Sequence, residues 1–288
     1  MTTDIKWLFL GDLQIPYHDV RAVSLVMDVI RTWKPDAIDI VGDIDDQLEY
    51  STYSDGTTDE FFNQLKAKSK NNEKLTIEYE KKLANGDEAE KPVLEDIDPL
   101  PMIKEYADEA KRFYADVRSI AKKADIHVSL GNHDIRVFKY IDRKAPEVID
   151  LLTPDLLWGL DDQGMSWRWY HERPFERFGG IHVHHGITST VTGLAVKNDI
   201  EEYGVSLVRG HDHRGGVVYR SYMMPGRSLA GMGTGHLSDV DAYGMRYADN
   251  PRWEQGFGIA HVVDDKAHLQ FIPIRDYVCV VDGHIFKG

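Results

Sequence analysis

Five short apolar runs along the chain predict buried strands. Each run is made of apolar or β-branched residues, as in the strands of a sheet that is covered on both faces. The runs are residues 5–10, 37–41, 126–130, 181–184 and 205–209.

The connections between these runs predict a parallel sheet. An amphipathic pattern begins after Asp19, a suitable N-cap, and continues to about Trp33, where Lys34 and Pro35 end it. The first two runs therefore form a strand–helix–strand unit, whose two strands are normally parallel. A second helix is predicted over residues 103–122, before the strand at 126–130.

The second half of the chain is richer in strand patterns. Residues 167–170 alternate and predict an edge strand or hairpin, and a short polar helix is predicted around 192–202. Antiparallel strands are predicted at the end of the chain, with residues 264–267 as a turn between the last two. These strands are residues 217–219, 256–263 and 268–274.

Residues 47–100 interrupt the alternation of predicted strands and helices. This stretch is rich in Lys, Glu, Asp and Asn. A polar helix is predicted over residues 66–82. We interpret 47–100 as a charged insertion in a single domain covering 1–288, lying over or beside the functional site; a surface loop without such a role is the alternative.

Composition narrows the class of protein. A chain of 288 residues with 42% hydrophobic residues can bury a large core. The single cysteine, Cys279, excludes an internal disulfide framework and lies in an apolar run, so we expect a buried strand residue. No run is long enough to span a bilayer and the first residues do not form a signal segment, which predicts a cytoplasmic protein without membrane contact. The net charge of −14 opposes sequence-independent binding to extended nucleic acid.

Metal-binding residue types follow directly after the five predicted buried strands. Carboxyl ends of such strands meet in one crevice, so these side chains are expected to converge. The spacing Asp12–Gln14 and His211–His213 lets both members of a pair reach one ion. Two divalent ions about 3.5–4 Å apart need a bridging carboxylate, and Asp43 is the candidate. The stretches are Gly11-Asp12-Leu13-Gln14, Gly42-Asp43-Ile44-Asp45-Asp46, Gly131-Asn132-His133-Asp134, His184-His185-Gly186 and Gly210-His211-Asp212-His213.

The ordered set resembles the calcineurin-like metallophosphoesterase family, phage and bacterial type, whose signature is D-x-H, G-D-x-x-D, G-N-H-D/E, H-G and G-H-x-H. The likeness extends over about residues 5–275. It implies a four-layer α/β sandwich, with two mixed β-sheets flanked by helices. It also implies one ion held by Asp12, Gln14, Asp43 and His213, and a second held by Asp43, Asn132, His185 and His211.

The resemblance also assigns catalytic roles. His133 would contact the phosphate and protonate the leaving oxygen, and Asp46 would orient His133. One position departs from the family, because Gln14 replaces its first histidine. An amide oxygen is a weaker and harder donor than imidazole, so the first ion is expected to bind loosely, to favour Mn or Mg, or to be absent at low metal concentration; Ni, Zn, Fe and Co are alternatives.

Other residues near these stretches are assigned by simpler interpretations. His18, Arg136 and Arg214 are candidate substrate contacts, although loop residues of these types are commonly exposed without a role. Strand alternation turns His184 away from His185, which predicts a packed or supporting histidine. Tyr17 and Tyr140 could stack on a base or simply pack.

Together these patterns predict a hydrolase that uses two divalent ions, foremost Mn, to cleave a phosphodiester in a small nucleotide or cyclic nucleotide. A nuclease acting on DNA or RNA ends is the second hypothesis, although the sequence shows only scattered basic clusters. A non-catalytic scaffold with the same fold is the third; the retained metal-binding set and His133 argue against it. The sequence leaves the oligomeric state open.

Overall fold

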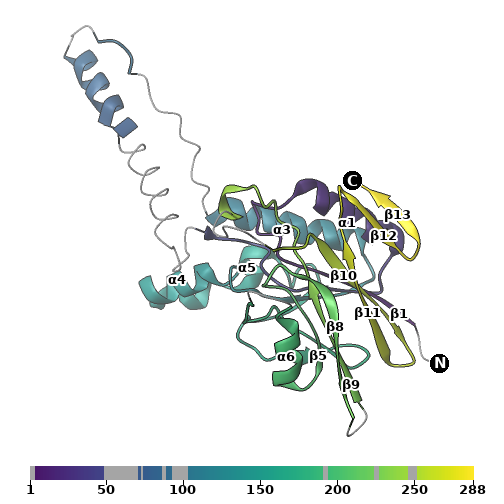
Figure 1. Cartoon of the computed structure of the whole chain (residues 1–288). Helices are drawn as coiled ribbons and strands as arrows, with labels where there is room; N and C mark the ends of the chain where they lie inside the picture. The colour runs from purple at the N-terminus through teal and green to yellow at the C-terminus, as the bar shows by residue number, and fades with distance from the viewer. Residues whose placement is uncertain are drawn as a thin grey trace. The chain divides into compact units, whose positions relative to one another are not determined.

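Two mixed β-sheets packed face to face form the centre of the protein (Figure 1). The computed structural model describes residues 4–48, 71–72, 74–85, 89–92, 103–190, 194–223, 227–245 and 252–288. The chain divides into one unit made of Met1–Tyr50 and Ile103–Gly288 and a second made of Ser51–Met102. Both sheets belong to the first unit.

The first sheet has six strands in the order β11-β10-β1-β2-β3-β4. The four strands from β1 to β4 are parallel, as predicted for β1 and β2, and β4 is an edge strand, as predicted. Strands β10 and β11 are antiparallel to their neighbours. The strands are β1 (Ile5–Leu10), β2 (Ala37–Ile40), β3 (Asp125–Ser129), β4 (Ser166–Arg168), β10 (Gly256–Val263) and β11 (Lys266–Pro273).

The second sheet has five strands in the order β5-β6-β7-β9-β8. Its three central strands are parallel and its two outer strands are antiparallel. The strands are β5 (Phe175–Glu176), β6 (Ile181–Val183), β7 (Ser206–Arg209), β8 (Gly215–Tyr222) and β9 (Arg227–Thr234). A separate hairpin follows, formed by β12 (Val278–Val281) and β13 (His284–Lys287).

Three hydrophobic cores define four layers. Because side chains alternate along a strand, Trp7 and Phe9 of β1 pack against the second sheet, while Leu8 and Leu10 pack against α1 (Val20–Trp33) and α3 (Ile103–Ile120). On the outer face of the second sheet, α6 (Val196–Tyr203) covers Leu207. The order helices, sheet, sheet, helix confirms the predicted four-layer α/β sandwich.

The predicted elements agree with the structure except where the apolar pattern is weak. Asp19 caps α1 as predicted, accepting hydrogen bonds from the backbone N–H groups of Arg21 and Ala22. Cys279 is buried in β12. Several elements were not predicted, namely β5, β9, β13, α4 (Arg136–Lys144), α5 (Pro154–Trp158) and the 3₁₀ helices Pro146–Leu151 and Tyr243–Met245.

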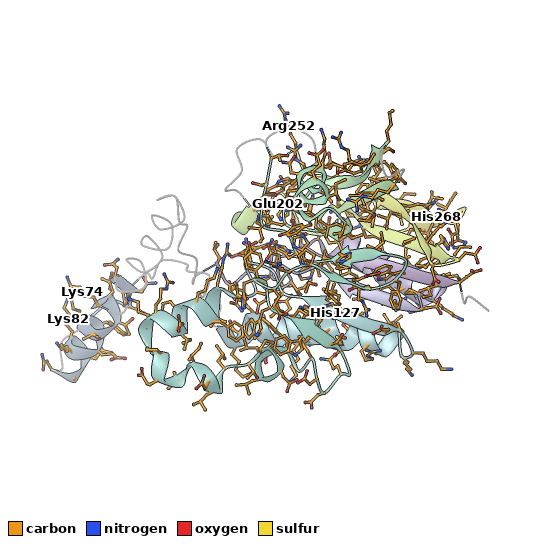
Figure 2. All side chains as sticks on the ribbon, turned by 90° about the horizontal axis from the view of Figure 1, so that it is seen from below. Lys74, Lys82, His127, Glu202, Arg252 and His268 are labelled. Carbon is orange, nitrogen blue, oxygen red and sulfur yellow. The ribbon has the colours of Figure 1, made fainter. Side chains whose placement is uncertain are left out.

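In the second unit the structure describes a helix over residues 71–72 and 74–84. Its charged face includes Lys74 and Lys82, which are exposed (Figure 2), and Lys74 lies 3.9 Å from Glu78. The predicted polar helix at 66–82 is thus confirmed from residue 71, and its first residues lie outside the described part of the chain. Among the described helices, none combines the length and the apolar character that crossing a membrane requires.

Candidate metal centre

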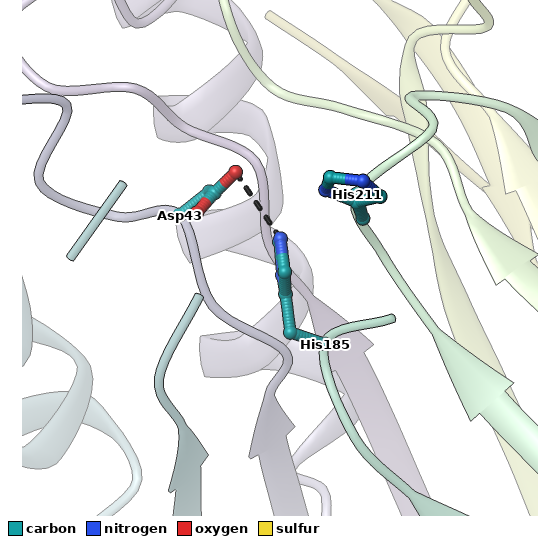
Figure 3. A group of neighbouring side chains, drawn as sticks. All are labelled: Asp43, His185 and His211. Carbon is teal, nitrogen blue, oxygen red and sulfur yellow. Dashed lines mark ion pairs between the residues drawn. The ribbon is translucent and has the colours of Figure 1, made fainter. Parts of the chain in front are cut away.

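Side chains from the ends of β2, β6 and β7 form the centre of the candidate site. The ligand atoms of Asp43, His185 and His211 all lie within 4.8 Å of one another (Figure 3). Asp43 Oδ2 is 3.2 Å from His185 Nε2. Asn132 Oδ1 lies 3.1 Å from the same nitrogen. The structure therefore brings together the four residues predicted to hold the second ion.

The residues predicted to hold the first ion lie beside this group. His213 Nε2 is 3.3 Å from Asp12 Oδ1. Gln14 Nε2 lies 3.3 Å from Asp43 Oδ2 and 3.4 Å from His213 Nε2. Gln14 Oε1, by contrast, is buried without a hydrogen-bond partner. Exchanging the two ends of this amide would turn Oε1 toward Asp43 and His213, the orientation that a metal ligand requires.

The backbone at these positions adopts an uncommon conformation. Positive φ angles occur at five predicted ligands, and non-glycine residues rarely adopt this left-handed region. Such conformations cost about 1–3 kcal/mol each and cluster at functional sites. The angles are 53° at Asp12, 59° at Gln14, 51° at Asp43, 77° at His211 and 56° at His213.

Two glycines allow the carboxylates to approach the neighbouring loops. A Cβ atom at Gly131 would overlap Asp43 Oδ1, and a Cβ atom at Gly210 would overlap Asp12 Oδ2. These contacts explain why glycine precedes both Asn132 and His211. The backbone N–H of His211 is held by Asp12, at 3.0 and 3.1 Å from its two oxygens.

Asp134, to which the sequence analysis gave no role, organises the loop after β2. Its carboxylate accepts hydrogen bonds from the backbone N–H groups of Asp43, Ile44 and Asp45 at 2.8, 3.0 and 2.9 Å, and from that of Gly131 at 2.7 Å. Burial, followed by the charge of Asp43, raises the pKa of Asp134 to about 6. Asp134 thus fixes the conformation that directs Asp43 into the site.

The charges of the site suit a bound cation. Burial alone would raise the pKa of Asp43, but the nearby histidines His133 and His185 lower it well below its usual range. Burial alone would lower the pKa of His185, but Asp43 raises it to about 9. The Nδ1 atom of His185 lies 2.6 Å from the carbonyl oxygen of Val41, so Nε2 is the nitrogen that faces Asp43.

This set of two carboxylates, two amides and three imidazoles, of which all but the half-buried Asn132 and His211 are buried, fits divalent cations. Carboxylate and amide oxygens with imidazole nitrogens are the donors that Mn, Fe, Zn, Co or Ni accept. Gln14 Oε1, His211 Nδ1 and His213 Nδ1 are buried without a hydrogen-bond partner. A metal ion would balance Asp12 and Asp43, which are 0% and 1% exposed.

His133 lies next to the ligand group and is oriented by two neighbours. Its Nδ1 is paired with the carboxylate of Asp46, as predicted, and its Nε2 lies 3.8 Å from Asp43 Oδ2. Arg136 Nη1 donates to the Asp46 carbonyl oxygen at 2.6 Å and to Asp46 Oδ1 at 3.0 Å. Arg136 Nη2 is 3.0 Å from His133 Nε2. Arg136 is thus a neighbour of the site, whereas the sequence analysis named it only as a possible phosphate contact.

A buried arginine, also missed in the sequence, connects the two loops that carry His185 and His211. Arg209, the last residue of β7, is 0% exposed and donates to Asp199 Oδ2 of α6 at 2.5 Å. Its Nη1 also donates to Thr188 Oγ1 at 3.2 Å, and its Nη2 donates to the Thr188 carbonyl oxygen. A Cβ atom at Gly186 would overlap the guanidinium, which explains the glycine after His185.

Aromatic side chains border the histidines on two sides. The half-buried Trp253 ring lies 4.5 Å from the His213 ring, and His236 lies 5.6 Å from it. Tyr170, also half-buried, lies 6.0 Å from the His185 ring. The sequence analysis gave none of these three a role, because each is far from the ligands in sequence.

The remaining candidates lie outside the ligand group. His184 is buried, with Nε2 3.9 Å from Asp199 Oδ2 and its ring 5.7 Å from Tyr203, which agrees with the predicted packed histidine. His18 pairs with Ser238 in a β-bridge and lies 3.9 Å from Glu109, and burial lowers its pKa. Arg214 leads from His213 into β8. Substrate contact by His18 or Arg214 stays a prediction.

Two phage proteins are similar to this chain over nearly its whole length. No family model matches the chain. The "Gene 54 protein" of Mycobacterium phage D29 is 23% identical over 287 residues, covering 96% of this chain and 97% of the relative. The protein of the same name in Mycobacterium phage L5 is 20% identical over 298 residues, with the same coverage.

Solved structures give weak matches over nearly the whole chain. Vacuolar protein sorting 29 from Cryptosporidium parvum superposes with a TM-score of 0.43 and 13% identity, covering 99% of this chain and 95% of that one. Zinc-bound Vps29 from Entamoeba histolytica gives 0.42 and 12%, covering 98% and 96%. The E. coli phosphoesterase YfcE gives 0.36 and 12%, covering 92% and 98%.

Proposed function

We propose that this protein is a metal-dependent phosphodiesterase that acts on a small nucleotide or cyclic nucleotide. The observation that carries the proposal is the convergence of seven metal-binding side chains from five separate loops, with the His133–Asp46 pair beside them. Strained backbone at five of the seven supports a functional role over a structural one.

The residues of the site would have separate roles in the reaction. Divalent ions held by the seven ligands would polarise a phosphoryl oxygen and lower the pKa of a water molecule. Asp43, between the two ligand groups, would be shared by both ions. His133 would hold the phosphate and give a proton to the leaving oxygen from Nε2, while Asp46 keeps Nδ1 occupied and the ring oriented.

Two features support Mn as the preferred metal and a small substrate. Gln14 adds an amide oxygen where an imidazole would favour Zn or Ni, so the donor set moves toward harder ions. The net charge of −14 repels long nucleic acid, whereas bound cations would reverse the sign of the field at the site itself. The two phage-encoded relatives support a setting in the cytoplasm of a bacterial cell or an infected host.

A panel of metals against substrates tests the proposal. Purified protein would be assayed with Mn, Mg, Ni and Zn against an aryl monoester, an aryl diester, 2′,3′- and 3′,5′-cyclic nucleotides and single-stranded DNA. The expected result is Mn-stimulated hydrolysis of diesters that exceeds hydrolysis of the monoester. Preferred cleavage of DNA would support a nuclease, and no hydrolysis with any metal would support a binding protein.

A further inference from the structure

We propose that three cations on one face of α4 bind a second anionic group of the substrate, on the leaving-group side of the scissile phosphate. These are Arg136, Lys139 and Arg143, which we call the α4 cationic face. The inference rests on the proposed function. It narrows the substrate to a short phosphodiester whose leaving group carries its own phosphate, such as a phosphorylated dinucleotide.

The α4 cationic face begins at the proposed acid. Arg136 Nη2 lies 3.0 Å from His133 Nε2, the atom that would protonate the leaving group. Residues 136, 139 and 143 are spaced three and four apart, which places them along one side of the helix. At about 1.5 Å per residue they extend for about 10 Å along α4, from Arg136 to Arg143. The cations therefore lead away from His133, the proposed acid, along one side of α4.

Lys139 lies on α4 between two other cations, Arg136 and Arg143. Burial lowers its pKa, and the charges of Arg136 and Arg143 lower it further. Like charges so placed repel one another, and an anion bound among them would relieve that repulsion. Arg143 and Lys144, in the last turn, also complement the helix dipole, but Lys139 is in the middle of α4, where the dipole does not account for it.

Tyr170 connects this face with the candidate metal centre. Its ring lies 5.7 Å from Lys139 Nζ and 6.0 Å from the ring of His185. A group leaving the metal centre toward Lys139 would therefore pass an aromatic face suited to a base. The chain has a net charge of −14, so a local group of cations here is a specific feature and not an average property of the surface.

Dithymidylate and its phosphorylated forms test the proposal. TpT, pTpT and TpTp would be compared at saturating Mn, with bis(4-nitrophenyl) phosphate as a diester whose leaving group is uncharged. The expected result is a kcat/KM about 10-fold higher for one phosphorylated form than for TpT, a difference equivalent to about 1.4 kcal/mol. Lys139→Glu should abolish that preference by raising KM.

Lys144→Glu is the matched control, because it makes the same charge change on the same helix but away from the α4 cationic face. It should keep the preference. Equal rates for TpT and both phosphorylated forms, or equal effects of the two variants, would overturn the subsite while hydrolysis of bis(4-nitrophenyl) phosphate still supports the proposed function. Failure to hydrolyse any diester would overturn both.

Discussion

The buried Arg209–Asp199 pair should be essential for both stability and metal affinity. The side chains are 0% and 4% exposed, and Asp199 also accepts a hydrogen bond from Thr188 Oγ1 at 3.1 Å. Asp199→Ala leaves a buried guanidinium without its counter-charge, which costs about 3–5 kcal/mol. Alanine has a higher helix propensity than aspartate, which offsets the loss of the acidic side chain from the first turn of α6.

Asp199→Ala should lower both the thermal stability of the protein and its affinity for Mn. At about 2–4 °C per kcal/mol for a domain of this size, Tm should fall by about 6–20 °C. Arg209 connects the loops that carry His185 and His211, so affinity for Mn should also fall. The expected decrease is about 10–100-fold, the usual range when a residue that orients metal ligands is replaced. Thermal unfolding and calorimetric titration of Mn measure the two effects.

Two control variants make this prediction specific. Asp28→Ala removes the partner of Arg31 in an exposed pair, with side chains 53% and 59% exposed, and should cost less than about 1 kcal/mol. Replacing both partners, Arg209→Met with Asp199→Leu, should recover part of the lost stability because no charge is left unpaired. If Asp199→Ala matches Asp28→Ala in both Tm and Mn affinity, the positioning role of the pair is refuted.

Three further predictions concern the ligands and the acid. Gln14→His should tighten Mn binding and move metal preference away from Mg, measured as metal-activation curves; unchanged curves would show that Gln14 is not a ligand. His133→Ala should keep its metal content while turnover falls about 10²–10⁴-fold, with a smaller loss for a nitrophenol leaving group than for an alcohol; equal losses would make His133 structural. In the metal-free protein His185, with a pKa raised to about 9, is protonated at pH 7, so Mn binding should release protons and tighten from pH 6 to 9. Titration in buffers of different ionisation enthalpy counts those protons, and none released would contradict this assignment.

The sequence predicted those parts of the fold and site that depend on local pattern. Apolar runs identified β1, β2, β3, β6 and β7, and polar residues directly after them identified the seven candidate ligands. Strand alternation was enough to separate His184 from His185.

The parts that depend on distant partners could not be predicted. Arg209 was visible as one charge in an apolar strand, but its partner Asp199 lies on α6, and no local pattern connects them. The supporting role of Asp134 depends on backbone N–H groups some 90 residues earlier. The strand β9 was missed because Gly231 and Gly233 dilute its apolar pattern.

The central claim is that Asp43 joins two metal ions in one site, and metal stoichiometry tests it most directly. Wild-type protein and Asp43→Ala would be loaded with Mn, freed of excess metal and analysed for metal content, with near-UV circular dichroism to confirm that the variant is folded. The account predicts two ions per chain in the wild type and loss of both metal and phosphodiesterase activity in the folded variant. A wild type that binds no Mn, or an Asp43→Ala variant that keeps two ions and its activity, would contradict it.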